Sequence, residues 1–387
     1  MNRESEKKRK NILKSATKVF SEKGFVDSKI SEIAKGAGFT SSGIYIYYKG
    51  KEEILFTIIE NFLIKSSSGL KEHLEGIQGP ENKLRKAIWF HCKSYSGNKK
   101  EIKIVLESRS YPRFYKSKAY SELTKYSGLI TNIIQEGIDD GTFSGISSPM
   151  ILRDMLLGAV DHIAINWTVQ DTPNSLDHAE MIYDMVMSSV QFSQNEILPL
   201  NKKSEKRIRI INEATALLAE KGFNDTSMLE IAKKADVAEG TVYEYFRNKE
   251  SLLISIPGEK LSELYESVSG KSPERKIKDI ISSIFRFYYN EKNFSTILVL
   301  MLRTNKKFQN SQSNKIIDNL FEIIKKIIIK GQKKGIFKES LNLDLCRNLL
   351  FGGVDHILIP WIIFKRKYDF EKIGDEVSRL FINAIKV

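Results

Sequence analysis

Small hydroxyl side chains at the start of a short helix are the first residues with a clear chemical use. Thr40 can cap a helix over Ser41–Tyr48, and the hydroxyls of Ser41 and Ser42 follow it directly. The start of a helix leaves backbone N–H groups unpaired, and with the helix dipole these groups attract phosphate. Small side chains also let the backbone approach a partner closely. This pattern predicts non-covalent binding of a polyanion.

Signatures of catalysis are missing from the sequence. It has no P-loop, no glycine-rich nucleotide turn, no nucleophile elbow and no His-Glu-x-x-His motif. Its two cysteines, Cys92 and Cys346, lie far apart without metal-like spacing. We therefore expect no enzyme activity, no cofactor and no metal. The lack of a disulfide framework, signal peptide or membrane-length apolar run predicts a cytoplasmic protein with no membrane partner.

Length and charge set further limits. The chain has 387 residues, enough for two to four domains. It carries 61 basic and 48 acidic residues, a net charge of +13. This balance favours an anionic partner, although many basic proteins have none.

Hydrophobic periodicity predicts the elements that position these side chains. Apolar residues on one face predict a helix over Lys7–Lys23, which Gly24 ends. Ser28 can cap a second short helix, Gly38 provides a turn, and a fourth helix is predicted from Lys51 to about Ser66. This order is the helix-turn-helix layout, in which the third helix enters the major groove of DNA.

The pattern after this segment changes to longer helices, so we expect an all-α protein. A linker is predicted at Asn195–Ser204, where a proline and two lysines occur. The predicted longer helices are Asn82–Ser94, Lys100–Ser108, Lys118–Asp140, Pro149–Val169 and Asp177–Glu196.

The second half of the chain repeats the first. Gly24 and Phe25 recur 198 positions later as Gly222 and Phe223. The segment LLGAVDHIAINW recurs 194 positions later as LFGGVDHILIPW. A repeat of this length indicates a tandem duplication. We expect DNA-binding domains at 1–50 and 205–249, helical ligand-binding and dimerisation domains at 51–195 and 250–387, and a linker at 196–204.

Two stretches carry a resemblance to a known family. GFTSSGIYIYYKGKEEIL, from Gly38, and DVAEGTVYEYFRNKESLL, from Asp236, resemble the tetracycline-repressor (TetR) family of transcription factors. Both copies keep the Gly-Phe pair, the Ile-Ala of the second helix, Tyr-x-Tyr and Lys-Glu. The resemblance implies a repressor with two reading heads on a double-stranded DNA operator, moved apart by an effector. Here both protomers would lie in one chain, as an intramolecular pseudo-dimer; whether chains pair further is open.

The resemblance also implies DNA contacts by position. It assigns phosphate contacts to a hydroxyl, a tyrosine and a lysine in each copy, and base or backbone contacts to the start of the third helix. The implied residues are Ser28, Thr40, Ser41, Ser42, Tyr45, Tyr47, Lys49 and Lys51 in copy one, and Thr226, Glu239, Gly240, Thr241, Tyr243, Tyr245, Arg247 and Lys249 in copy two.

The copies differ at the third helix. Copy two has Ala238 where a capping hydroxyl is usual, and it has Glu239 and Glu244 where copy one has Ser41 and Ile46. Phosphates repel a carboxylate, and among the base edges only the N4 amino group of cytosine forms a favourable hydrogen bond with a carboxylate. Either the heads read different half-sites, or the second binds weakly. We prefer the first, because copy two keeps its tyrosines and basic residues, and it predicts an asymmetric operator.

The larger domains carry a weaker resemblance. The segment from Val105, VLESRSYPRFYKSKAYSEL, is similar to the branch of the family that controls fatty-acid degradation and senses acyl-CoA. Arg109 and Arg303 are equivalent, and each can pair with an anionic ligand or form a salt bridge between helices. Aromatic side chains can line an apolar cavity or be plain core. The candidate aromatic residues are Phe90, Tyr95, Phe114, Trp167, Phe287 and Trp361.

Two Asp-His pairs recur, at Asp161-His162 and Asp355-His356. Metal binding, a pH switch or packing of an interface helix each fit, and packing is preferred. We expect the last two helices of each copy to form an internal four-helix interface. Two other functions stay open: a drug-responsive repressor of an efflux system, and a ligand-sensing scaffold with weakened DNA binding.

Overall fold

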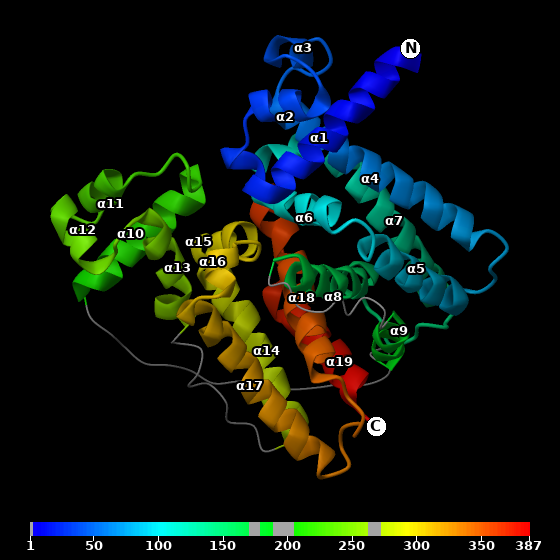
Figure 1. Cartoon of the computed structure of the whole chain (residues 1–387). Helices are drawn as coiled ribbons and strands as arrows, with labels where there is room; N and C mark the ends of the chain where they lie inside the picture. The colour runs from blue at the N-terminus through cyan, green and yellow to red at the C-terminus, as the bar shows by residue number, and fades with distance from the viewer. Residues whose placement is uncertain (1–2, 170–178, 189–204, 262–271) are drawn as a thin grey trace. The chain divides into compact units, whose positions relative to one another are not determined.

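The computed structural model describes residues 3–169, 179–188, 205–261 and 272–387 (Figure 1). Apart from one isolated β-bridge, these residues form helices joined by turns and irregular segments, so the all-α prediction is confirmed. None of the described helices is both long and apolar enough to cross a bilayer. The predicted linker at 196–204 lies outside the described residues.

Contacts divide the chain into two compact units. The first consists of Met1–Thr142 and Ile163–Glu180, and the second of Phe143–His162 and Met181–Val387. Helix α8 (Pro149–Val169) is shared between them, because its first part belongs to the second unit. The domain boundaries expected from the repeat therefore remain a prediction.

The first unit starts with α1 (Arg3–Asp27), α2 (Ile30–Ala37) and α3 (Ser41–Tyr45), which we call head one. The predicted end of the first helix at Gly24 is confirmed as a kink with φ 78° and ψ 164°, and one further helical turn follows. Glycine adopts this conformation at little cost because it has no Cβ. Helix α3 is shorter than predicted, since it ends before Ile46.

Longer helices complete the first unit. Helix α4 packs on α5 and α7, while α6 packs on α1 and so joins head one to the rest of the unit. Helix α4 extends eight residues beyond the predicted end at about Ser66, and the helices predicted at Asn82–Ser94, Lys100–Ser108 and Lys118–Asp140 start and end within two residues of those observed. Their bounds are α4 (Lys51–Leu74), α5 (Pro80–Tyr95), α6 (Lys99–Glu107) and α7 (Lys118–Asp139). Of the helix predicted at Asp177–Glu196, the described part is α9 (Ala179–Ser188), which belongs to the second unit from Met181 on.

The second unit repeats this plan. Head two consists of α10 (Glu205–Lys221), α11 (Met228–Lys234) and α12 (Glu239–Tyr245). Helix α14 packs on α17 and α19, and α15 packs on α10 as α6 does on α1. The remaining helices are α13 (Lys249–Lys260), α14 (Pro273–Asn290), α15 (Lys292–Ile297), α16 (Lys306–Gln309), α17 (Gln312–Gln332), α18 (Leu343–Phe364) and α19 (Phe370–Ile385).

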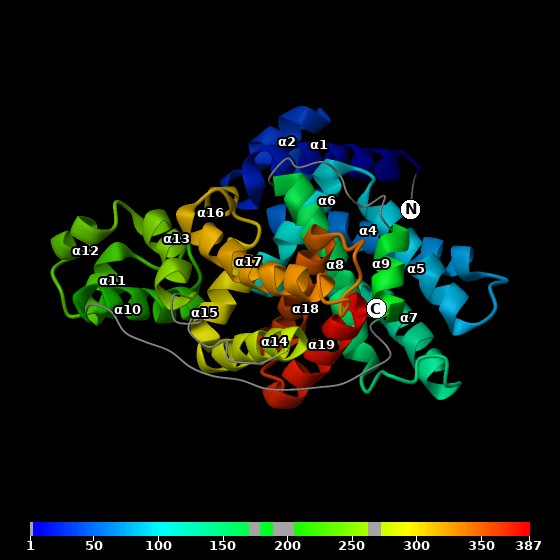
Figure 2. The same cartoon turned by 90° about the horizontal axis from the view of Figure 1, so that it is seen from below.

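Within the second unit, the first part of α8 crosses α18 at very close range (Figures 1 and 2). A Cβ atom added to Gly158 would collide with the backbone of Gly352, and the reverse holds equally. The crossing is flanked by two reciprocal contacts, His162 with Asp355 and His356 with Asp161. Each contact joins one helix from each copy of the repeat.

Candidate nucleic-acid interfaces and effector region

The start of α3 is built as the sequence predicts. The hydroxyl of Thr40 accepts a hydrogen bond from the backbone N–H of Gly43 at 3.1 Å, so Thr40 is the cap. Its oxygen also lies 3.0 Å from the hydroxyl of Ser42. Ser41 and Ser42 are exposed. The N-terminal end of α3 is therefore ordered by its own side chains and open to a partner.

Helix α3 is anchored by one face and presents the other. Ile44 is fully buried and Tyr48 is 3% exposed, whereas Tyr45 is 57% and Ile46 is 77% exposed. Tyr47 is half-buried, with its ring 5.8 Å from that of Phe39, and Lys49 is exposed. The buried pair is spaced by one helical turn and orients the exposed residues away from the core.

In each head, an arginine of the first helix contacts an aromatic ring at the end of the third helix. The sequence analysis did not predict this contact. The guanidinium of Arg9 lies 5.1 Å from the ring centre of Tyr48, and that of Arg207 lies 4.7 Å from Phe246. These are cation–π distances. The sequence contains a trace of this contact: Arg9 recurs 198 positions later as Arg207, and the aromatic Tyr48 recurs at the same distance as Phe246.

The lysine that opens the fourth helix holds the Gly-Phe turn. The ammonium of Lys51 donates to the carbonyls of Val26 and Ser28, both at 2.9 Å, and lies 4.6 Å from the ring centre of Phe25. Lys249 donates to the carbonyl of Thr226 at 2.7 Å in the same way. Burial lowers the pKa of both lysines. The lysine thus has a structural role that the sequence did not reveal, and its phosphate contact stays a prediction.

The hydroxyls at the start of the second helices point inward. Ser28 is 4% and Thr226 is 2% exposed, and both donate back to the carbonyl of the preceding glycine. The prediction that Ser28 caps the second helix is wrong, because Lys29 occupies the cap position. In copy two the cap is Ser227, which accepts from the N–H of Glu230 at 3.1 Å. Burial removes both predicted hydroxyls from the surface that DNA can touch.

Head two presents a different third helix. The cap position of α12 is Ala238, which provides no side-chain cap. Val242 anchors the helix in the core, while Tyr243 is 48% and Tyr245 is 41% exposed. Glu244 is exposed, and in the described part of the chain no ion pair engages either carboxylate of α12. Gly240 and Arg247 are also exposed, and Glu239 and Thr241 are half-buried.

Arg303 forms a buried ion pair, and its predicted contact with a ligand stays a prediction. Its guanidinium contacts both carboxylate oxygens of Asp355, at 2.6 and 3.1 Å, and Asp355 also accepts from His162 at 2.8 Å. Burial alone would raise the pKa of Asp355, but the charge of Arg303 and the hydrogen bond from His162 outweigh it and lower the pKa to about 2. This is the salt-bridge alternative left open for the equivalent arginines. Arg109 is half-buried, and its carbonyl accepts from Tyr115 at 2.9 Å.

Each of the two histidines contacts an aspartate of the facing helix. Burial lowers the pKa of His162, against the opposing effect of Asp355. No cluster of three or more potential metal ligands occurs among the described residues. The arrangement fits packing of an interface helix.

Most candidate aromatic residues pack against other rings as core. Phe90 lies against Gly69, Tyr95 is 5.9 Å from Phe62, and Phe114 is 5.8 Å from Tyr120. The further contacts are Phe287 with Phe294 at 5.5 Å, Trp361 with Phe370 at 4.9 Å, and half-buried Trp167 with the ammonium of Lys99 at 5.6 Å.

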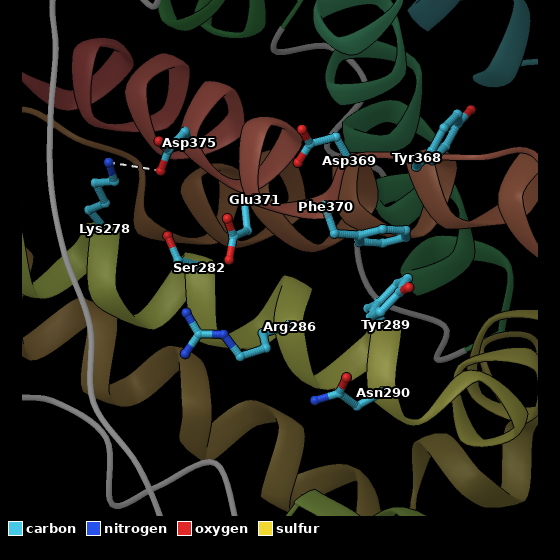
Figure 3. A pocket seen from close by; sticks show the side chains of 10 residues that line it. All are labelled: Lys278, Ser282, Arg286, Tyr289, Asn290, Tyr368, Asp369, Phe370, Glu371 and Asp375. Atoms are coloured by element: carbon cyan, nitrogen blue, oxygen red, sulfur yellow. Dashed lines mark ion pairs between the residues drawn. The ribbon is translucent and has the colours of Figure 1, made fainter.

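A groove of about 810 Å³ lies between α14 and α19 of the second unit (Figure 3). Figure 3 shows Tyr289 beside Phe370 at one end and the ion pair of Lys278 with Asp375, at 2.8 Å, at the other. No predicted ligand residue lines it, although the ring of Trp361 lies 6.2 Å from that of Tyr289 and 4.9 Å from that of Phe370. The lining residues are Lys278, Ser282, Arg286, Tyr289, Asn290, Tyr368, Asp369, Phe370, Glu371 and Asp375. They come from elements about 80 residues apart, so no local sequence signal marks the groove.

Comparison with known protein families identifies two family models that match the chain. A family model described as bacterial regulatory proteins, tetR family, matches residues 12–58 and 210–256. A second model, described as YsiA-like protein, C-terminal region, matches residues 61–189 and 258–384.

Individual proteins match about half of this chain. The fatty acid metabolism regulator protein of Bacillus subtilis is 30% identical over 191 residues, which are 48% of this chain and 98% of that protein. The uncharacterized regulator YdgC of the same organism is 44% identical over 191 residues, 47% of this chain and 93% of that protein. The crystal structure of the regulator FadR from Bacillus subtilis with stearoyl-CoA is 23% identical, covers 47% of this chain and 99% of that chain, and has a TM-score of 0.43. Because the two family models together match most of the sequence, each of them twice, the chain belongs to the TetR family of DNA-binding transcriptional regulators, with both family regions duplicated in tandem.

Proposed function

We propose that this regulator is a repressor whose two heads read unlike half-sites of one operator. In this proposal residues 1–50 and 205–249 bind DNA, residues 51–195 and 250–387 bind the effector and pair with each other, and residues 196–204 link the copies. The main observation behind this proposal is that α3 and α12 present different residues, although equivalent buried contacts hold both helices in place.

The exposed residues of the two third helices suit different base edges. Head one presents the hydroxyls of Ser41 and Ser42 and the apolar side chain of Ile46. Hydroxyls can accept or donate, and an apolar side chain fits the methyl group of thymine. Head two presents the exposed Glu244 and the half-buried Glu239, and a carboxylate accepts from the N4 amino group of cytosine. A half-site for head two should therefore contain cytosine at a position where that of head one does not.

When both heads belong to one chain, as in a pseudo-dimer, each head can have a different amino-acid sequence. The crossing of α8 with α18 supports it, because the reciprocal contacts of His162 and His356 take one partner from each copy. A homodimer carries two identical heads, which favour a palindrome. Two heads in one chain are free of that constraint.

A fatty acyl-CoA is the proposed effector. Two observations support it: the resemblance of the segment from Val105, and the name of the fatty acid metabolism regulator that is 30% identical. In the first unit, the segment at 103–113 contacts head one and the start of α4. The ring of Tyr111 lies 5.0 Å from Phe25, Arg113 contacts Glu52 at 3.0 Å, and Lys103 donates to the carbonyl of Ser21 at 2.8 Å. A shift of the segment at 103–113 would therefore move head one.

Selection of binding sites from random DNA with the full chain tests the proposal. We expect two unlike half-sites, with cytosine enriched in only one of them. A perfect palindrome would overturn the asymmetric reading. Release of the selected duplex is then measured with stearoyl-CoA, with free coenzyme A as control. Equal release by both compounds, or by neither, contradicts the acyl-CoA part.

A further inference from the structure

A row of lysines follows one face of α1. Lys7, Lys10, Lys14 and Lys18 are all exposed, and their spacing of three, four and four residues keeps them within one helical stripe. The buried residues Ile12, Ala16 and Phe20 lie on the opposite face. Across the described residues, none of the four lysines takes part in an ion pair. We call these four residues the lysine stripe.

The fold does not need this stripe. The equivalent positions of α10, 198 residues later, hold Glu205, Ile208, Asn212 and Ala216, and α10 still forms and packs on α11 and α13. Like charges at these spacings repel each other along a helix. The lysine stripe therefore works against the stability of α1, which points to a ligand that compensates the repulsion.

The contrast extends over the whole head. The 45 residues at 7–51 contain 11 basic and 3 acidic residues, a net charge of +8. The equivalent 45 residues at 205–249 contain 8 basic and 8 acidic residues, a net charge of zero. Neutralisation of phosphates with release of counterions supplies the sequence-independent part of DNA affinity. Head one has the net positive charge that favours this contribution, whereas the basic residues of head two are balanced by acidic ones.

The stripe is well placed for DNA. In Figure 1, α3 and the N-terminal end of α1 lie at the same end of the first unit, so a duplex on α3 can continue past α1. Lys7 and Lys18 are eleven residues apart, which is about 16 Å along a helix. Phosphates of one strand follow each other every 3.4 Å or so along the duplex axis. The length of the stripe therefore matches that of four or five successive phosphates.

We propose that the lysine stripe binds the phosphate backbone of the DNA that flanks the half-site of head one. Head one then supplies most of the electrostatic affinity of the chain, and head two mainly discriminates between sequences. This inference rests on the proposed function, because it needs an operator on which α3 is seated.

Salt-dependent binding of the full chain tests this. The stripe variant carries Lys7→Gln, Lys10→Gln, Lys14→Gln and Lys18→Gln. The matched control carries Lys326→Gln, Lys330→Gln, Lys333→Gln and Lys334→Gln, which removes the same charge from exposed lysines at the end of α17. Fluorescence anisotropy is recorded over a range of salt concentrations, on the selected operator with a ten-base-pair flank on each side and on a duplex trimmed to the two half-sites. Thermal melts should show both variants folded.

On the flanked duplex we expect the slope of log affinity against log salt to fall by about 3 to 4 for the stripe variant, since each phosphate contact contributes about 0.9. The control should keep the wild-type slope. On the trimmed duplex the stripe variant and wild type should converge. Equal slopes for wild type and stripe variant on the flanked duplex would overturn the inference, as would an equal loss in the control. Failure of the wild-type chain to bind any selected duplex would instead overturn the proposed function.

Discussion

Head one and head two share their supports and differ in the surface they present. In both, an aliphatic residue of the third helix is fully buried, an arginine of the first helix lies on an aromatic ring, and a lysine closes the Gly-Phe turn. The exposed residues differ in charge, from a net +8 to zero over equivalent positions. Packing constrains the first set, because any change there leaves a cavity or an unpaired group. The exposed residues are constrained only by the DNA that the head binds.

The two heads also differ in the residues that start the third helix. Head one has Gly38 with φ 78° and the cap Thr40, whereas head two has Asp236 with φ 52° and the uncapped Ala238. A left-handed conformation is easier for glycine than for aspartate. A missing cap costs about 1 kcal/mol. Head two therefore begins its third helix at a small energetic cost that head one avoids.

The largest expected effect concerns the scaffold behind the heads. Asp355→Leu leaves the buried guanidinium of Arg303 without its carboxylate, and breaking a buried pair in this way costs about 3–5 kcal/mol. We expect a matching loss in the free energy of unfolding, measured with urea. The double variant with Arg303→Leu should recover part of it, because no charge is then left buried. A single variant as stable as wild type would show that the pair is unimportant.

A pH effect should separate the two copies. Burial raises the pKa of Glu107 to about 7, against a weaker opposing effect of Lys103, and the position 194 residues later is Met301. Between pH 4.5 and 7 the folded chain keeps a proton that the unfolded chain releases, so stability falls as pH rises through this window. The expected loss is about 3 kcal/mol. Urea unfolding at pH 5 and pH 8 should show it in wild type and not in Glu107→Gln, and identical pH dependence in both would contradict it.

Exchange of the third-helix surface should remove the difference in specificity. The triple variant Glu239→Ser, Gly240→Ser and Glu244→Ile gives α12 the exposed residues of α3. We expect its selected operator to become nearly palindromic, with about 1–3 kcal/mol lost for each base pair that the carboxylates favoured. Competition binding between the asymmetric and palindromic duplexes measures the change. An unchanged preference for the asymmetric duplex would mean that other residues determine the half-site.

The smallest effect concerns the caps. Ala238→Thr should stabilise head two, and Thr40→Ala should destabilise head one, each by about 1 kcal/mol. Hydrogen exchange of the amides of α3 and α12 reports each head separately. If Thr40→Ala left exchange in α3 unchanged, the hydrogen bond to Gly43 would contribute nothing measurable.

Local signals were sufficient for much of the fold. The cap at Thr40, the end of regular helix at Gly24 and the bounds of α7 and α8 follow from residues within one or two helical turns, and each agrees with the structure. The same reasoning was wrong for Ser28, because a cap and a buried hydroxyl one position earlier look alike in sequence. The third helix also ended earlier than its apolar pattern suggested.

The sequence by itself determined the family, the tandem repeat and the asymmetry of the heads, since all three are written in residue identity at matched positions. Only the tertiary structure decided what Lys51 and Arg303 contact, since their partners lie 23 to 52 residues away and are chosen by packing. It also decided that the histidines pair with aspartates of the facing helix. An arginine or a histidine has the same appearance in sequence whether it meets a ligand or a carboxylate, and folding alone brings one or the other within reach.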